Sequence, residues 1–118
     1  MTDRELLEMA AKAAGLRVKT WDGHTGVMCA IDNDRYGRMW MPLTDDGDAL
    51  RLAVKLGLCI TQYPIYAEPK HSVLVKRPQL RDDDRERIEE IAVYNGDPYA
   101  ATRRAIVRAA AAIGEKMP

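Results

Sequence analysis

The segment from Asp97 to Gly114 constrains the fold more than any other part of the 118-residue chain. Asp97 is a natural helix N-cap, and Pro98 suits the first helical position because it lacks the backbone N–H that would be unpaired there. Apolar or half-polar residues then recur at helical spacing on one face, namely Thr102, Ile106, Ala109, Ala110 and Ile113. We therefore predict a helix over 98–113 that ends at Gly114.

A second helix is predicted at the N-terminus, over residues 3–14. Thr2 and Glu5 have the spacing of a capping box, in which each side chain satisfies a backbone N–H of the first turn. Gly15 follows the apolar face and can adopt the left-handed conformation that ends a helix.

A third helix is predicted over 45–56, after Pro42 interrupts the strand pattern of the preceding segment. Thr44 or Asp45 is its N-cap, and the acidic residues of its first turn interact favourably with the positive, N-terminal end of the helix dipole. Gly57 ends it.

The segments between these helices are typical of short antiparallel strands. Alternation or apolar runs indicate strands at 16–20, 27–31, 39–41, 58–67 and 72–76. Pro64 cannot donate to a ladder, so 58–67 is either an edge strand or two short strands. Residues 85–94 fit a helical face as well as a strand, and we favour a strand that enters the Asn95-Gly96 turn.

These elements predict one α+β domain over residues 1–118, with an antiparallel sheet of four to five short strands flanked by three helices, as in an α-β-α sandwich. The apolar fraction of 47% and the charged fraction of 31% suit a single globular core. Cys29 and Cys59 both lie in apolar runs, which predicts two reduced, buried thiols.

Charge and hydropathy exclude several classes of function. Eighteen basic residues balance eighteen acidic ones, which argues against general nucleic-acid binding, since that needs a cationic excess. No run approaches the roughly twenty apolar residues of a membrane span. The charged, amphipathic N-terminus does not resemble a secretory signal, so we expect a cytoplasmic protein.

Three blocks of the chain resemble the phage ABA sandwich domain family, a group of small phage and prophage proteins. The blocks are MTDRELLEMAAKAAG, PLTDDGDALRLAVKLG and ATRRAIVRAAAAIGE, and together they cover about 45 of the 118 residues. The resemblance implies helices flanking a central sheet and a protein made in an infected host cell. It implies no biochemical activity.

No arrangement of residues predicts a metal site. Residues 32–37 begin like a calcium loop, but its fifth position is Tyr36 and its twelfth is Leu43, where a bidentate Glu is needed. His24 and His71 are far apart and have no companion at ligand spacing.

Catalytic motifs are missing as well. The sequence has no GxSxG elbow and no glycine-rich phosphate loop. The acidic run 82–84 is interleaved with arginines, as in an ordinary solvated loop. We expect a protein that is not an enzyme and that uses no cofactor.

Basic and aromatic residues are the remaining binding candidates. Arg104 and Arg108 are four residues apart and share a helix face, an arrangement that suits bidentate recognition of phosphate. The candidate ligand-binding residues are Arg103, Arg104, Arg108, Tyr99, Lys76 and Arg77. The simpler explanation is that these arginines pair with surface acids such as Asp45 and Asp46.

Two functional hypotheses follow. In the first, the chain is a counter-defence binder that sequesters a small anionic, nucleotide-type signal, in a pocket that a homo-oligomer can complete. In the second, it is an accessory or adaptor protein that binds or inhibits a host or phage protein. An aromatic- and methionine-bearing surface would serve the second, although core packing explains the same residues: Met28, Met39, Met41, Trp40 and Tyr36.

Overall fold

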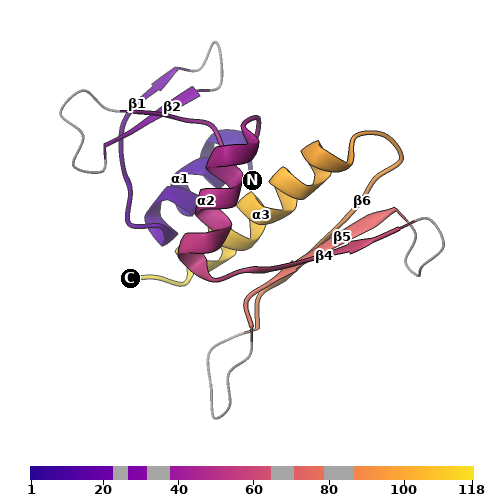
Figure 1. The fold of residues 1–118 in the computed structure, drawn as a ribbon. Helices are drawn as coiled ribbons and strands as arrows, with labels where there is room; N and C mark the ends of the chain where they lie inside the picture. The colour runs from indigo at the N-terminus through magenta and orange to yellow at the C-terminus, as the bar shows by residue number, and fades with distance from the viewer. Residues whose placement is uncertain (23–26, 32–37, 65–70, 79–86) are drawn as a thin grey trace.

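The computed structural model describes residues 1–22, 27–31, 38–64, 71–78 and 87–118 (Figure 1). In chain order the elements are α1 (Asp3–Ala13), β1 (Arg17–Asp22), β2 (Val27–Ile31), β3 (Arg38–Trp40), α2 (Asp46–Leu56), β4 (Cys59–Tyr63), β5 (Ser72–Lys76), β6 (Glu89–Val93) and α3 (Pro98–Glu115). The α+β class and the places of the three helices are as the sequence predicts.

Each helix begins at a side-chain cap. The Thr2 hydroxyl accepts a hydrogen bond from the backbone N–H of Glu5 at 3.2 Å. Asp45, rather than Thr44, caps α2 and accepts from the N–H of Asp48 at 2.8 Å. The Asp97 carboxylate accepts from two N–H groups of the first turn of α3. These caps satisfy backbone donors that a helix leaves unpaired, which is why the sequence locates the helix starts well.

The glycines at the helix ends differ in their roles. Gly15 and Gly57 have φ values of 72° and 64°, and they end α1 and α2 in the predicted left-handed conformation. Gly114, in contrast, does not end α3, which continues to Glu115. A Cβ atom at Gly114 would overlap the carbonyl oxygen of Met9 and lie 2.9 Å from its carbonyl carbon. Glycine is therefore required there for the close approach of α1.

The six strands form two sheets instead of the single central sheet that the sequence predicts. One sheet has the order β1-β2-β3 and the other β4-β5-β6, and all pairings are antiparallel. Helix α2 begins shortly after β3, and the Asp48 carboxylate of α2 accepts from the backbone N–H of Met41 at 2.9 Å. This turn leads the chain away from β3, so that β4 starts a new sheet on another side of the helices (Figure 1).

The two ambiguous segments are resolved as strands. Residues 89–93 form β6, which pairs with β5, so the helical alternative for 85–94 is excluded over that range. In the described part of the 58–67 segment, which stops at residue 64, one short strand forms, β4, and it ends at Tyr63 directly before Pro64; residues 65–67 lie outside the described residues. Proline interrupts the pairing because it has no N–H to donate.

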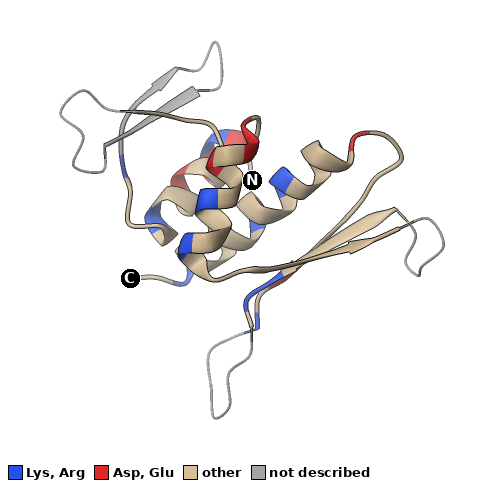
Figure 2. Cartoon of the chain, viewed as in Figure 1, with Lys and Arg blue, Asp and Glu red and all other residues tan. Residues whose placement is uncertain are grey.

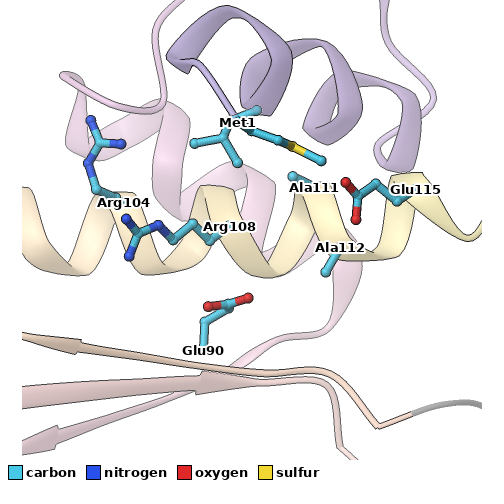
Figure 3. Close-up of a pocket in the computed structure, with 8 residues that line it drawn as sticks. Met1, Glu90, Arg104, Arg108, Ala111, Ala112 and Glu115 are labelled. Carbon is cyan, nitrogen blue, oxygen red and sulfur yellow. The ribbon is translucent and has the colours of Figure 1, made fainter.

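Helix α3 is at the centre of the packing. It lies between α1 and the β4–β5–β6 sheet and also contacts α2 (Figures 1 and 3). The face of the sheet toward α3 carries Val73 and Val75, which are fully buried. Alanines at 105, 109 and 110 are also fully buried, and their small side chains let the neighbouring elements approach closely.

The opposite face of the β4–β5–β6 sheet is open among the described residues. Ile91 and Val93 on β6 are 55% and 74% exposed. Cys59 on β4 is exposed too, so the prediction that both thiols are buried is wrong for this residue. The apolar run around Cys59 belongs to an edge strand with helices on one face only. The side chain of Cys29 lies outside the described residues.

Of the surface residues predicted for protein binding, three are placed by the structure. Trp40 is 2% exposed and belongs to the core, as the simpler explanation requires, Met41 is half-buried, and Met39 is 51% exposed. Tyr36 and the side chain of Met28 lie outside the described residues.

Candidate functional site

A cavity of about 310 Å³ opens between α1, α3 and β6. Its charged lining consists of Arg104, Arg108 and Glu115 from α3 and Glu90 from β6 (Figure 3). Leu6 of α1 and two alanines of α3 supply an apolar wall. The cavity therefore combines two guanidinium groups and two carboxylates with a small apolar surface.

The two arginines reach this cavity together because they are one helical turn apart. The guanidinium of Arg104 donates to both carboxylate oxygens of Asp3, at 3.0 and 3.3 Å. That ion pair is solvent-accessible on both sides, with side chains 38% and 58% exposed. Arg108 is exposed and has no hydrogen bond or ion pair with any residue in the described part of the chain. Its five N–H donors are thus available to a ligand.

The two carboxylates face the cavity from different elements. Figure 3 shows Glu90 pointing from β6 toward α3, on the side where Arg108 lies, with Glu115 at the far end of the cavity. Carboxylates accept hydrogen bonds and repel anions. The arrangement suits a ligand that has an anionic group at one end and hydrogen-bond donors elsewhere.

Arg103 does not join the other two arginines. Its guanidinium donates to the Asp46 carboxylate at 2.6 Å and to the Leu43 carbonyl at 3.0 Å. The Arg103 side chain is only 16% exposed. It joins α3 to the start of α2, and its pairing with Asp46 matches the simpler explanation given for the arginines.

Tyr99 lies at a second, smaller cavity of about 200 Å³ between α2, β4 and α3. Tyr99, Leu50 and Ile60 form its apolar rim and are 67%, 59% and 38% exposed. Within it, the Gln62 amide donates to the Thr102 hydroxyl at 2.8 Å, joining β4 to α3. The tyrosine is therefore not placed to stack on a ligand held by Arg108.

Lys76 and Arg77 are at the end of β5 and line neither cavity. Lys76 is opposite Glu89 in the ladder, on the alternate face from Val75. The backbone N–H of Arg77 donates to the carbonyl of Ile88 at 3.0 Å. The six predicted residues are thus divided among three places: Arg104 and Arg108 line the first cavity, Tyr99 and Arg103 line the second, and Lys76 and Arg77 line neither.

Two charged side chains of the cavity were not predicted from the sequence, those of Glu90 and Glu115. Side chains alternate between the two faces of a strand, so Glu90 lies on the same face of β6 as Ala92. The sequence indicates this face once 89–93 is known to be a strand. Glu115 is two turns from Arg108, at a spacing that places both on one side of α3. Neither spacing indicates that β6 lies beside this part of α3.

The described residues also show no metal site and no membrane-spanning helix. No group of three or more His, Cys, Asp or Glu residues among them is arranged to hold a metal ion. His71 is exposed and makes an edge-to-face contact with Tyr94, with ring centroids 6.1 Å apart. His24 and the segments 32–37 and 82–84 lie outside the described residues. No helix in the described ranges is long and apolar enough to cross a membrane.

The ion pairs of α2 have a structural role. Asp48 is 6% exposed, and its carboxylate accepts from the Arg51 guanidinium at 2.8 Å in addition to the N–H of Met41. The hydrogen bond that the Arg51 guanidinium donates to the Asp48 carboxylate raises the pKa of Arg51 above its ordinary value. These contacts fix the first turn of α2 against the end of β3.

Comparison with known proteins gives no match: no family model fits the chain, and no curated protein and no solved structure is similar to it. Membership of the phage ABA sandwich domain family therefore stays a prediction from the three sequence blocks.

Proposed function

We propose that this protein is a non-catalytic binding protein that holds a small anionic ligand of the nucleotide class in the cavity between α1, α3 and β6. The observation that carries the proposal is Arg108, a guanidinium without a partner among the described residues, one turn from Arg104 at the same cavity. A planar guanidinium matches two phosphate oxygens, and two forks on one helix face can hold one phosphate group.

The ion pair of Arg104 is compatible with this role. An exposed ion pair contributes about 0–1 kcal/mol, whereas a hydrogen bond to a charged group contributes about 1.5–3 kcal/mol. Asp3 uses two of the five N–H donors of Arg104 and holds the side chain at the cavity. A phosphate can accept from the remaining donors or displace Asp3.

Size and polarity narrow the ligand class. Pockets for small molecules span about 300–1,000 Å³, so a cavity of about 310 Å³ suits a ligand of mononucleotide size rather than a larger one. Glu90 and Glu115 can accept hydrogen bonds from amino or hydroxyl groups of such a ligand. Sequestering a nucleotide signal in the cytoplasm of an infected cell, as a counter-defence protein would, needs binding alone and no catalytic group.

The alternative function is that of an accessory protein that binds a host or phage protein. The apolar rim of the second cavity favours it, because Tyr99 and Leu50 expose more than half of their surface there. Exposed aromatic and aliphatic groups around a hollow are common at protein interfaces.

Calorimetric titration of linear and cyclic mononucleotides tests the proposed function. We expect binding to the wild-type chain, and a fall in affinity of about ten- to a hundredfold for Arg108→Lys and for Arg104→Lys. Lysine keeps the charge but loses the planar fork. The control is Arg87→Lys, a residue two positions before β6 whose side chain is 72% exposed and pairs with Glu89 outside the cavity. It should bind as the wild type does.

The melting temperature of each variant completes this experiment. Both cavity variants should melt close to the wild type, since Arg108 is exposed and the solvent-accessible ion pair between Arg104 and Asp3 contributes little to stability. Suppose that no nucleotide binds and that the Lys variants melt several degrees lower. Arg104 and Arg108 would then be structural, and the protein-binding alternative would take the place of this proposal.

A further inference from the structure

Strand β4 is at the edge of its sheet. It pairs with β5 along one side, and no other strand of the described residues lies along its second side. Four of its five residues are exposed. A free edge presents a row of unpaired N–H and C=O groups, which another strand can pair with unless charges, proline or a covering element block it.

The two edges of this sheet differ in charge. Strand β4 has the sequence CITQY, with no charged residue, and Figure 2 shows it without a blue or red position. The other edge strand, β6, begins with Glu89 and Glu90. Charged side chains on an edge strand are one of the features that oppose pairing with another strand. Of the two edges, β4 is therefore the one that its own charges do not protect from pairing.

Exposed apolar side chains gather beside the β4 edge. Ile60 of β4, Leu50 of α2 and Tyr99 of α3 surround the second cavity, and Val54, one turn after Leu50, is 72% exposed. Single exposed apolar residues are ordinary, but a group around one hollow marks an interaction surface. This surface is continuous with the uncharged strand edge.

We propose that a second copy of this chain pairs with β4 in antiparallel fashion, so that two three-stranded sheets join into one continuous sheet around a two-fold axis. Full overlap of the strand places Thr61 opposite the Thr61 of the second copy. Ile60 then faces Gln62 of the second copy, and Pro64 ends the pairing on each side.

The charges at the two ends of β4 are complementary in this arrangement. Lys55 lies in the last turn of α2, which leads into the start of β4. Asp97 precedes α3, whose Thr102 is bonded to Gln62 near the end of β4. An antiparallel pairing brings the start of β4 in one copy, near Lys55, toward the end of β4 in the other copy, near Asp97. The apolar side chains around Ile60 are buried at the same time.

This interface is independent of the proposed ligand cavity. The cavity that contains Arg104 and Arg108 is lined by α1, α3 and β6, and no residue of β4 lines it. The two proposals can therefore fail separately, one in nucleotide titrations and the other in measurements of mass.

The first test is sedimentation equilibrium of the wild-type chain and of Ile60→Lys. A lysine on an edge strand opposes pairing with another strand. We expect the mass of two chains for the wild type and the mass of one chain for Ile60→Lys at the same micromolar concentration. The matched control is Ile91→Lys on β6, an exposed position on the opposite edge, which should keep the mass of two chains.

The second test is oxidative crosslinking, which also reports the register. In a Cys59→Ser background, Thr61→Cys places one thiol at the proposed two-fold axis, where paired Cα atoms are about 4.5–5.5 Å apart and within reach of a disulfide. We expect a disulfide-linked dimer for this variant and none for Cys59→Ser alone, which still contains Cys29.

A wild-type chain that sediments as a monomer throughout the micromolar range would overturn the proposal. A dimer that survives Ile60→Lys and is lost with Ile91→Lys would also overturn it, because the second copy would then bind at the other edge. A dimer that survives Ile60→Lys and gives no Thr61→Cys crosslink would place the interface elsewhere.

Discussion

Replacing Gly114 by alanine is expected to destabilise the protein by about 2–3 kcal/mol. On helix propensity alone the change should stabilise it by up to about 1 kcal/mol, because alanine is the better helix former and restricts the unfolded chain. The structure reverses the sign, since a Cβ at this position would overlap the backbone carbonyl of Met9. Backbone atoms cannot rotate away, so α1 would have to move off α3.

Urea unfolding followed by circular dichroism measures this effect. Gly96→Ala is the control, because no atom lies within 4 Å of the position that its Cβ would take. We expect Gly96→Ala to stay within about 0.5 kcal/mol of the wild type, as surface substitutions usually do. A Gly114→Ala protein as stable as the wild type would show that α1 and α3 can separate enough to admit the extra methyl group, which contradicts a tight contact at Met9.

The Leu7→Ala substitution in α1 is expected to cost about 3 kcal/mol of unfolding free energy. Leu7 is 2% exposed and is among the largest fully buried side chains of the core. Truncating it removes apolar contacts and leaves a hole that the alanine-rich surface of α3 has few atoms to fill. Large-to-small changes of this kind cost about 2–5 kcal/mol.

The control for Leu7 is Ile91→Ala on the open face of the sheet. It removes the same number of carbon atoms from a side chain that is 55% exposed. We expect less than about 1 kcal/mol for it in the same urea titration. If the two variants lose the same unfolding free energy, Leu7 is not part of the hydrophobic core.

The helices could be predicted from the sequence because their signals are local. Asp45 and Asp97 cap backbone groups within three residues, and Gly57 stops its helix by its own conformation. The role of Gly114 could not be predicted, because it depends on Met9, which is far away in the chain. The division of the strands into two sheets depends equally on distant packing, since each strand by itself fits either arrangement.

The candidate site could be predicted only in part. The four-residue spacing of Arg104 and Arg108 placed both at one cavity, since that spacing keeps side chains on one helix face. Arg103 is displaced from Arg104 by about 100° around the helix, and this turns it toward Asp46 of α2. The contribution of Glu90 requires that β6 lie beside α3, which no local pattern indicates.

The most direct test of the ligand cavity is to follow backbone amide signals by nuclear magnetic resonance while the tightest-binding mononucleotide is added. We expect the largest shifts around Leu6, Glu90 and the 104–115 segment of α3, and we expect them to disappear in Arg108→Lys at the same ligand concentration. Shifts centred on Leu50, Ile60 and Tyr99 at the second cavity, or no saturable shifts, would contradict this expectation.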